Sequence, residues 1–470
     1  MSQAAVLNSL SKVGPVMLIA CTVAAIGFFS LVIFELKTIR TFGIFTGAGI
    51  VSALILELTF IPALRSMLPA PSLREVTREG HETIWDRITT WFYTTTMFRR
   101  KTMYAIVGAI IFILSLGGLR LQIDNTTKSY FVKSNPLIID DDHINEKMAG
   151  TNSFYVLVEG SSPDTIKRPD VLHAIDDLQT YLGKKPHIGK TLSIVDFIKK
   201  MNESMNGDKK EFFKIPESQD LVAQYLLLYS NSGEPGDFDN LVDNDYQSAV
   251  VTTFTKTDST SYLEGVIGDI NAFTKEHFPK DVKISVGGGS IGSVAINEVM
   301  IEEKILNILQ IVGAVFIITA LAFRSLTAGL FILIPLLAAI FVNFGVMGLL
   351  GIPLQIGTAL ISAMAVGIGA DYGIYMSYRM REELATSHDE DAAIKKAFLS
   401  AGKAALFVST AVAGGFGVLM FSFGFMVHIW MGFLISIAML VSSVSTLTLF
   451  PALIFTFRPK FIFNRKVQTL

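Results

Sequence analysis

The sequence is poor in charge and almost free of cysteine. Charged residues make up only 17% of its 470 residues, against about a quarter in soluble proteins. The formal net charge is −2, so no basic excess favours nucleic acid as a partner. The single cysteine, Cys21, has no second cysteine with which to form a disulfide in the chain. The composition therefore argues against a disulfide-stapled secreted domain and against a nucleic-acid-binding protein.

Motifs for cofactor chemistry are missing as well. The seven histidines show no metal-ligand spacing, and neither a phosphate-binding loop nor a Ser/His/Asp arrangement stands out. Residues 287–292 match the letters of a dinucleotide fingerprint, but an apolar helix follows where that fold needs a second strand. We interpret them as a flexible exit from a domain. The chain also opens without a cleavable signal peptide. We therefore expect no enzyme, no metal and no organic cofactor.

Long apolar runs dominate what is present. Half of the chain (51%) is hydrophobic, and the mean hydropathy is +0.49. A bilayer core about 30 Å thick needs about 20 apolar residues per helix. Eight segments meet that length: 14–34, 41–64, 102–121, 304–323, 327–349, 354–377, 403–423 and 428–456.

Lysine and arginine set the expected orientation of these spans. They concentrate in the segments 65–101, 378–403 and 457–470, which all fall on one side of an eight-span chain. Positive loops mark the cytoplasmic side. We therefore expect a multi-pass protein of the cell membrane with these segments inside. Within 65–101, the apolar spacing predicts an amphipathic helix that lies in the membrane interface.

Residues 122–302 have a different character, because they are polar and rich in turns. Apolar strands at 154–158, 249–254 and 282–286 alternate with helical stretches at 170–182 and 261–277, and extra helices are expected near 196–229. The alternation predicts an extracytoplasmic α+β domain of ferredoxin-like, porter-type topology. The expected organisation is then 1–64 (two spans), 65–101 (linker), 102–121 (one span), 122–302 (outer domain), 303–456 (five spans) and 457–470 (tail).

An internal repeat is the most informative pattern. Residues 4–64 and 392–453 match at an offset of 388, which becomes 389 after one insertion. Apolar similarity between membrane helices is common, but shared Gly, Thr and Pro at fixed spacing over two consecutive helices is not. Parallel repeats of this kind build many transporters. The matched pairs include Gly14 and Gly402, Thr22 and Thr410, Gly43 and Gly432, and Pro62 and Pro451.

The order of elements resembles the resistance-nodulation-division (RND) superfamily, and within it the MMPL-like exporters. One helix precedes an outer domain, five helices follow in a sterol-sensing-like bundle, and the third of these carries Gly-x-x-x-Asp-Tyr, here Gly367 to Asp371-Tyr372. The resemblance implies two six-helix halves, of which 102–456 match the second and 1–64 the last two helices of the first. It therefore implies a partner: a missing N-terminal half, a separate chain or a second copy.

Asp371 is the principal candidate site residue. A carboxylate at mid-membrane costs about 2.5–3.5 kcal/mol even on lenient scales, and desolvation favours its neutral form. Such a group can load a proton on one side and release it on the other, with the adjacent Tyr372 hydroxyl as a donor. The alternative is a structural, permanently protonated Asp371 bonded to a neighbouring helix. Glu57 is a second carboxylate within an apolar run. It is either a further ionisable site in the membrane or a side chain that extends to the membrane–water interface.

The supporting candidates have structural alternatives of similar weight. Gly367, Gly369 and Gly373 either let α-helices pack closely or permit motion. Ser409 and Thr410 on the following span either hydrogen-bond Asp371 or bond their own helix backbone.

These observations, with the resemblance, predict an exporter driven by the proton gradient, with lipids or other hydrophobic molecules as cargo and membrane lipids as surroundings. Two alternatives stay open. One is a sterol-sensing-like sensor or assembly factor that transports nothing. The other is a proton-driven subunit of protein translocation. An exporter or translocation subunit driven by protons needs Asp371 to titrate, whereas a sensor does not. The sequence does not identify the cargo.

Overall fold

A computed structural model describes residues 2–68, 82–232, 236 and 238–463. Within these, the side chains of residues 2, 3, 232, 362, 363 and 365–368 are not described. Parts of the predicted linker (69–81) and tail (464–470) lie outside the described residues. The chain divides into two compact units, residues 1–123 with 299–470, and residues 124–298.

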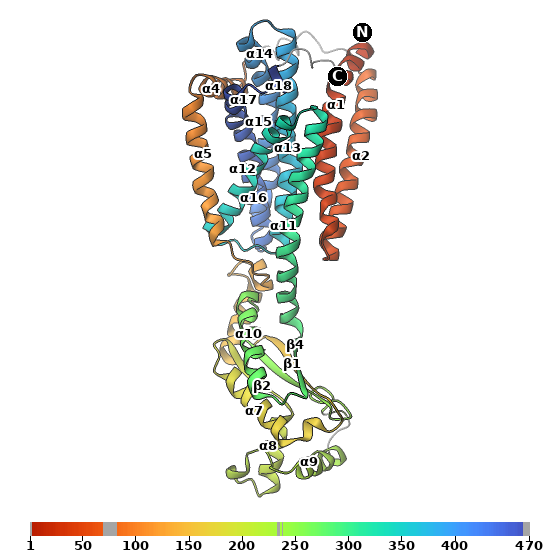
Figure 1. Cartoon of the computed structure of the whole chain (residues 1–470), viewed down its shortest axis with the longest axis vertical. Helices are drawn as coiled ribbons and strands as arrows, with labels where there is room; N and C mark the ends of the chain where they lie inside the picture. The colour runs from red at the N-terminus through yellow and green to blue at the C-terminus, as the bar shows by residue number, and fades with distance from the viewer. Residues whose placement is uncertain (1, 69–81, 233–235, 237, 464–470) are drawn as a thin grey trace. The chain divides into compact units, whose positions relative to one another are not determined.

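The first unit is a bundle of long helices (Figure 1). Its elements are α1 (Ser2–Phe29), η1 (Ser30–Ile33), α2 (Lys37–Met67), α4 (Ile84–Phe98), α5 (Arg100–Leu116), η2 (Gly117–Arg120), α11 (Gly289–Ala322, which begins in the second unit), α12 (Leu326–Leu350), α13 (Ile356–Thr386), α14 (Glu390–Ala397), the π-helical turn η6 (Phe398–Gly402), α15 (Lys403–Gly417), η7 (Val418–Phe421), α16 (Met426–Leu447), α17 (Leu449–Phe457) and α18 (Lys460–Phe463).

Seven helical segments among the described residues are long and apolar enough to cross a membrane. They confirm seven of the predicted spans and a multi-pass membrane protein. The predicted span at 354–377 is also helical, in α13, which is 31 residues long. Six of its side chains are outside the description, and it is not among the seven. α12, α13 and α16 pack on one another, and α1 packs along α13. Buried Ile332, Ile374 and Ile454 belong to their common core.

The internal repeat has the same form in both copies. η1 at 30–33 and η7 at 418–421 are short 3-10 helices at the offset of 388, and α2 and α16 begin at 37 and 426, an offset of 389. The one-residue insertion therefore lies in the loop between them.

The repeated glycines also pack alike. A β-carbon at Gly43 would lie 2.6 Å from the carbonyl oxygen of Phe28 and 2.6 Å from Leu31 Cβ. A β-carbon at Gly432 would lie 2.6 Å from the carbonyl oxygen of Phe416 and 3.1 Å from Leu419 Cβ. These are the equivalent atoms of the second copy. Each glycine therefore lets its hairpin close at the same point.

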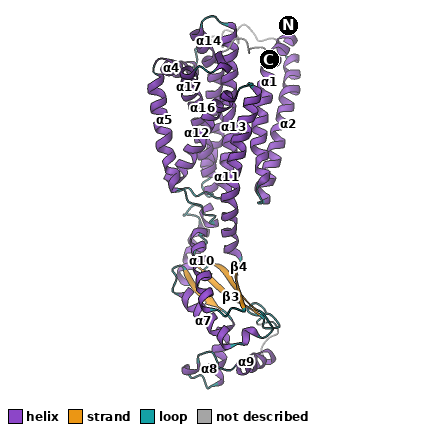
Figure 2. Ribbon diagram, in the orientation of Figure 1, coloured by secondary structure: helices purple, strands orange, loops and turns teal. Residues whose placement is uncertain are grey.

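The second unit is built on a four-stranded antiparallel sheet (orange in Figure 2). The strands follow the order β2-β3-β1-β4, and one helix follows β1 and another follows β3, which is the ferredoxin-like arrangement. Its elements are η3 (Thr127–Tyr130), α6 (Pro136–Lys147), β1 (Asn152–Gly160), η4 (Thr165–Lys167), α7 (Pro169–Gly183), β2 (Ile188–Leu192), α8 (Ile194–Met205), η5 (Lys210–Phe212), α9 (Gln219–Ser232), β3 (Ser248–Thr255), α10 (Thr260–His277) and β4 (Val282–Gly287).

The α+β fold and its predicted strands and helices are confirmed, and β2 and α6 are elements that the sequence missed. Alternation explains the sheet: Phe154, Val156 and Val158 of β1 are fully buried in the core, whereas Tyr155 between them is exposed. The predicted flexible exit at 287–292 is wrong. Gly288 makes one tight turn at φ +98°, and α11 begins at Gly289. The sheet is antiparallel throughout, so it lacks the parallel unit of a dinucleotide fold.

Candidate functional site

Asp371 lies in the middle of α13, and one of its carboxylate oxygens is left without a partner. Oδ1 is buried and accepts no hydrogen bond from any described residue. The side chain as a whole is partly exposed. A buried acceptor without a donor costs about 1–3 kcal/mol, and a protonated carboxyl lowers part of that cost because it carries no charge. The geometry therefore favours a group that binds a proton.

Two further polar groups lie near Asp371, and a third lies near those two. The Cys21 thiol of α1 and the Tyr375 hydroxyl of α13 are near enough to Asp371 for electrostatic interaction, and Glu57 of α2 is within the same range of both. Tyr375 follows Asp371 by one helical turn, so the two share a face of α13. Glu57 is exposed. The sequence had placed Glu57 and Cys21 in separate apolar runs, and the structure brings both to the side of α13 that bears Asp371.

Tyr372 faces a different helix. Its hydroxyl is buried and donates to Met439 Sδ of α16 at 3.8 Å. Consecutive residues of a helix point about 100° apart, so the neighbouring hydroxyl does not serve Asp371 in this structure. Gly369 also meets α16: its carbonyl accepts a hydrogen bond from Ser442 Oγ at 2.8 Å, and a β-carbon there would lie 3.0 Å from that oxygen. Gly369 thus allows close packing of the two helices.

The remaining predicted site residues are more ordinary. A β-carbon at Gly373 would make normal contacts with Ile332, at 3.6 Å and beyond. Gly367 lies among the residues whose side-chain positions are outside the description. Ser409 Oγ and Thr410 Oγ1 donate to the carbonyl of Leu406, one turn back, at 3.0 and 2.9 Å. Their helix, α15, packs on α16. The structure therefore places both hydroxyls on their own backbone.

A polar cluster that the sequence did not reveal ties α11 to η1 and α13. Lys304 is only 3% exposed, and its ammonium donates to the Ala359 carbonyl of α13 at 2.6 Å and to Asn307 Oδ1 at 3.4 Å. Asn307 Nδ2 in turn donates to Ser30 Oγ at 2.8 Å. Glu303 Oε1 accepts from the backbone N–H of residue 35 at 2.6 Å, while its Oε2 is buried without a described partner. A buried charge in membrane is costly and is retained for a role.

The sequence held a weak signal for this cluster. Lys304 and Asn307 are three residues apart, so they share one face of a helix. The fourth predicted apolar run begins at residue 304, because a charged residue beside an apolar run usually marks the end of a span. α11 extends 15 residues further back, to Gly289, so the lysine is inside the helix.

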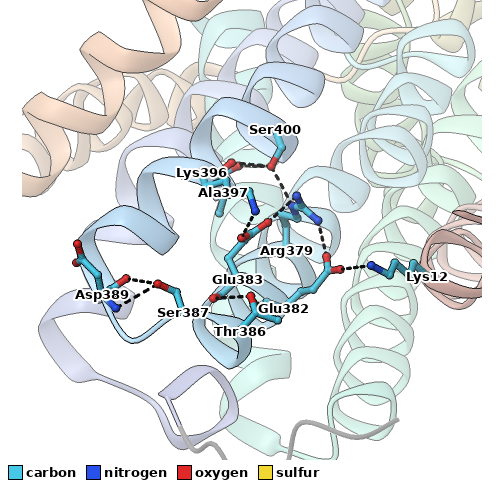
Figure 3. A network of polar contacts seen from close by, with 10 residues as sticks. All are labelled: Lys12, Arg379, Glu382, Glu383, Thr386, Ser387, Asp389, Lys396, Ala397 and Ser400. Carbon is cyan, nitrogen blue, oxygen red and sulfur yellow. Dashed lines mark hydrogen bonds and ion pairs between the residues drawn. The ribbon is translucent and has the colours of Figure 1, made fainter. Parts of the chain in front are cut away.

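A second polar network holds the other end of α13 (Figure 3). Glu383 is 6% exposed and pairs with Arg379 Nη2 at 2.6 Å and with Lys396 Nζ at 2.9 Å. Arg379 also pairs with Glu382 at 2.5 Å and donates to Ser400 Oγ at 3.0 Å, in the π-helical turn η6. These bonds connect α13 to α14 and η6.

Asp371 thus lies between two polar anchors on one helix. Ala359 precedes it by 12 residues, about 18 Å of helix, and Arg379 follows it by eight residues, about 12 Å. Both ends of α13 are bonded to other helices, whereas the carboxyl between them has a free acceptor. Among the described residues, no three His, Cys, Asp or Glu side chains gather as a metal site.

The α+β domain offers a groove of about 770 Å³ on the face of its sheet. Apolar Leu157, Val250 and Phe254 line it together with Tyr155 and Thr252. Every lining side chain is uncharged. The groove is therefore suited to a neutral, largely apolar molecule.

Comparison with known proteins gives a family match over most of the chain. The MMPL family model matches residues 1–94 and 138–467. A membrane protein of Methanocaldococcus jannaschii is 26% identical over 361 residues, which cover 75% of this chain and 89% of that protein. The trehalose monomycolate exporter MmpL3 of Mycobacterium tuberculosis is 30% identical over 94 residues, 20% of this chain and 10% of the exporter.

A solved structure shares the fold. The cryo-EM structure of the hedgehog release protein Disp from the water bear Hypsibius dujardini has a TM-score of 0.58 at 13% identity. The match covers 95% of this chain and 58% of the Disp chain. The chain thus spans a little over half the length of that structure, and the likeness concerns the fold alone.

Proposed function

This chain belongs to the MMPL family of transporters, in the RND superfamily, and from that premise we propose that it exports lipids or other hydrophobic molecules at the expense of a proton gradient. The observation that carries the proposal is the buried, unpartnered Oδ1 of Asp371 in the middle of α13. Insertion of a carboxylate at the centre of a membrane helix costs about 2.5–3.5 kcal/mol. A role in proton exchange would explain why the residue is present despite that cost. Binding of a proton from one side and release to the other would couple the bundle to the gradient.

Two observations support a hydrophobic cargo. The sheet face of the α+β domain has an uncharged groove lined by apolar side chains and by hydroxyl and amide groups. The matched segment of 94 residues belongs to a protein described as an exporter of trehalose monomycolate. We propose that the groove contacts cargo.

The test is transport in liposomes that contain the purified chain, together with the partner half or second copy that the resemblance implies, and a fluorescent phospholipid. An acceptor protein such as albumin outside the vesicles collects any exported lipid. We expect lipid release that requires a pH gradient across the membrane and stops when an ionophore collapses it. Release that is the same with and without the gradient would contradict proton coupling. Coupled proton flux without lipid release would contradict the cargo only.

The side of the outer domain is a second prediction. With Cys21 replaced by Ser, a cysteine introduced at the exposed Lys190 of β2 should react with an impermeant thiol reagent added to intact cells. A cysteine at the exposed His388, between α13 and α14, should react only after the membrane is opened. The reason is the concentration of basic residues in the segment that contains His388. The reverse labelling pattern would invert the topology.

A further inference from the structure

Helix α4 has a buried face that packs on the bundle. Thr89, Tyr93 and Thr96 are at most 3% exposed. The Tyr93 ring packs edge-on against Phe398 at 5.6 Å between centroids, and Thr96 Oγ1 donates to the Leu447 carbonyl at 3.1 Å. This face is fully used by contacts within the protein.

The opposite face of α4 carries a second set of large side chains that nothing in the described chain covers. Ile84, Trp91 and Phe98 are 68%, 56% and 79% exposed. Arg87 and Thr94 lie between them and are also exposed. The spacing 84, 87, 91, 94, 98 puts all five on one stripe of the helix. Three large apolar side chains on one stripe are unfavourable in water, so a non-aqueous surrounding is expected for them.

The position of α4 in the chain supplies that surrounding. α5 begins at Arg100, two residues after the end of α4, and it starts one of the seven candidate spans. α4 itself has 15 residues and is not among these spans. A short helix with Trp at the mouth of a span is typical of the membrane interface, where Trp is enriched.

Basic side chains accompany the stripe. Arg99 lines a groove of about 370 Å³ together with Trp91, Thr94, Thr95 and Phe98. Arg87 lines an adjoining groove of about 320 Å³. Neither arginine forms an ion pair with a carboxylate of the described residues.

Two acids, Glu82 and Asp86, line the groove of Arg87, and Asp86 is already bonded to another cation. Lys403 Nζ donates to both oxygens of Asp86, at 2.8 and 2.9 Å. This hydrogen bond, followed by those from Thr83, lowers the pKa of Asp86 to about 2. The stripe therefore combines apolar area with two arginines that lack a described counterion, and guanidinium groups are well suited to phosphate.

We propose that this face of α4 is a binding site for an anionic phospholipid of the adjacent leaflet. Arg87 and Arg99, which are about 18 Å apart along the helix, attract anionic headgroups, and the acyl chains lie along Trp91 and Phe98. The site fixes α4, and with it the start of α5, at the membrane surface. The proposal does not depend on what the protein transports.

The chain's three tryptophans allow a direct test. With Trp85 and Trp430 replaced by Phe, Trp91 is the only fluorophore of its kind. The protein is placed in phosphatidylcholine vesicles that contain equal fractions of either brominated phosphatidylglycerol or brominated phosphatidylcholine. We expect Trp91 to be quenched by both, with an apparent preference for the anionic lipid of about fivefold per arginine.

The decisive variant is Arg87→Gln/Arg99→Gln, which should reduce the preference to unity while Trp91 remains quenched. The matched control is Lys184→Gln/Lys190→Gln, which removes the same charge from exposed positions of the outer domain and should change nothing. Melting of each variant, followed by the reaction of Cys21 with a fluorogenic dye, shows that it is folded. Equal quenching of Trp91 by the two lipids, in the protein that retains Arg87 and Arg99, overturns the proposal. So does absence of quenching, or loss of the preference when inorganic phosphate is added.

Discussion

Replacement of Asp371 by Asn should abolish gradient-driven transport and leave the bundle folded. Asn keeps the shape and the hydrogen-bonding capacity of the side chain but has no proton to exchange. Oδ1 is unpartnered in the parent, so an uncharged amide leaves no new charge buried. We expect lipid release from liposomes to fall to the level of vesicles without protein. The melting temperature, measured with a fluorogenic thiol dye on Cys21, should not fall.

Tyr372→Phe is the control for this experiment. The Tyr372 hydroxyl donates to Met439 Sδ, a weak acceptor, so its removal should cost little and transport should persist. Asp371→Glu retains a titrating group and should keep part of the activity. Full transport by Asp371→Asn would disprove the proton role. A loss with Tyr372→Phe as complete as that with Asp371→Asn would show that the proton passes through the tyrosine.

Replacement of Arg379 by Gln should cause the largest loss of stability among single changes at the C-terminal end of α13. Glu383 is 6% exposed and has Arg379 and Lys396 as its cations. Loss of one partner of a buried pair costs about 3–5 kcal/mol. Because Arg379 is 31% exposed and Lys396 remains, we expect about 2–3 kcal/mol. The dye-monitored melt should shift down by several degrees.

Two further variants test whether the loss of stability arises because the buried Glu383 carboxylate has lost a partner. Lys12→Gln removes a 61% exposed lysine that lies 3.9 Å from Glu382, and it should cost about 0–1 kcal/mol. In Arg379→Gln/Glu383→Gln the buried carboxylate is removed together with its arginine, so part of the lost stability should return. If Arg379→Gln melts like Lys12→Gln, the network adds nothing to stability. If the double variant is worse than the single one, the loss arises from packing instead.

The elements that could be predicted from sequence are those with a strong local pattern. Apolar runs of about 20 residues identified the spans, and alternation of apolar residues identified three of the four strands. β2 was missed because it is an edge strand of five residues, Ile188–Leu192, with three exposed or partly exposed polar or glycine positions. Its pairing with β3 comes from the fold rather than from its own composition.

The candidate site was less predictable, because its contacts join helices that are far apart in the chain. Asp371 stood out by residue type alone. Cys21 and Glu57 precede it by more than 300 residues, and no local pattern connects them. Tyr372 illustrates the opposite error: adjacency in sequence suggested adjacency in space, yet its hydroxyl meets Met439 of α16. Lys304 was missed because a charge beside an apolar run reads as the end of the run.

The two copies of the duplicated hairpin differ in what they pack against. The second copy leaves exposed a helix surface that the first copy buries. In α1 a stripe of small apolar residues is buried where the helix packs on α13. In α15 the equivalent stripe is exposed. α13, the helix of Asp371, packs on this stripe of α1. A second helix with the side-chain spacing of α13 could therefore pack on α15 in the same way. The equivalent positions are Val16 and Ala404, Ala20 and Val408, Val23 and Ala411, and Gly27 and Gly415.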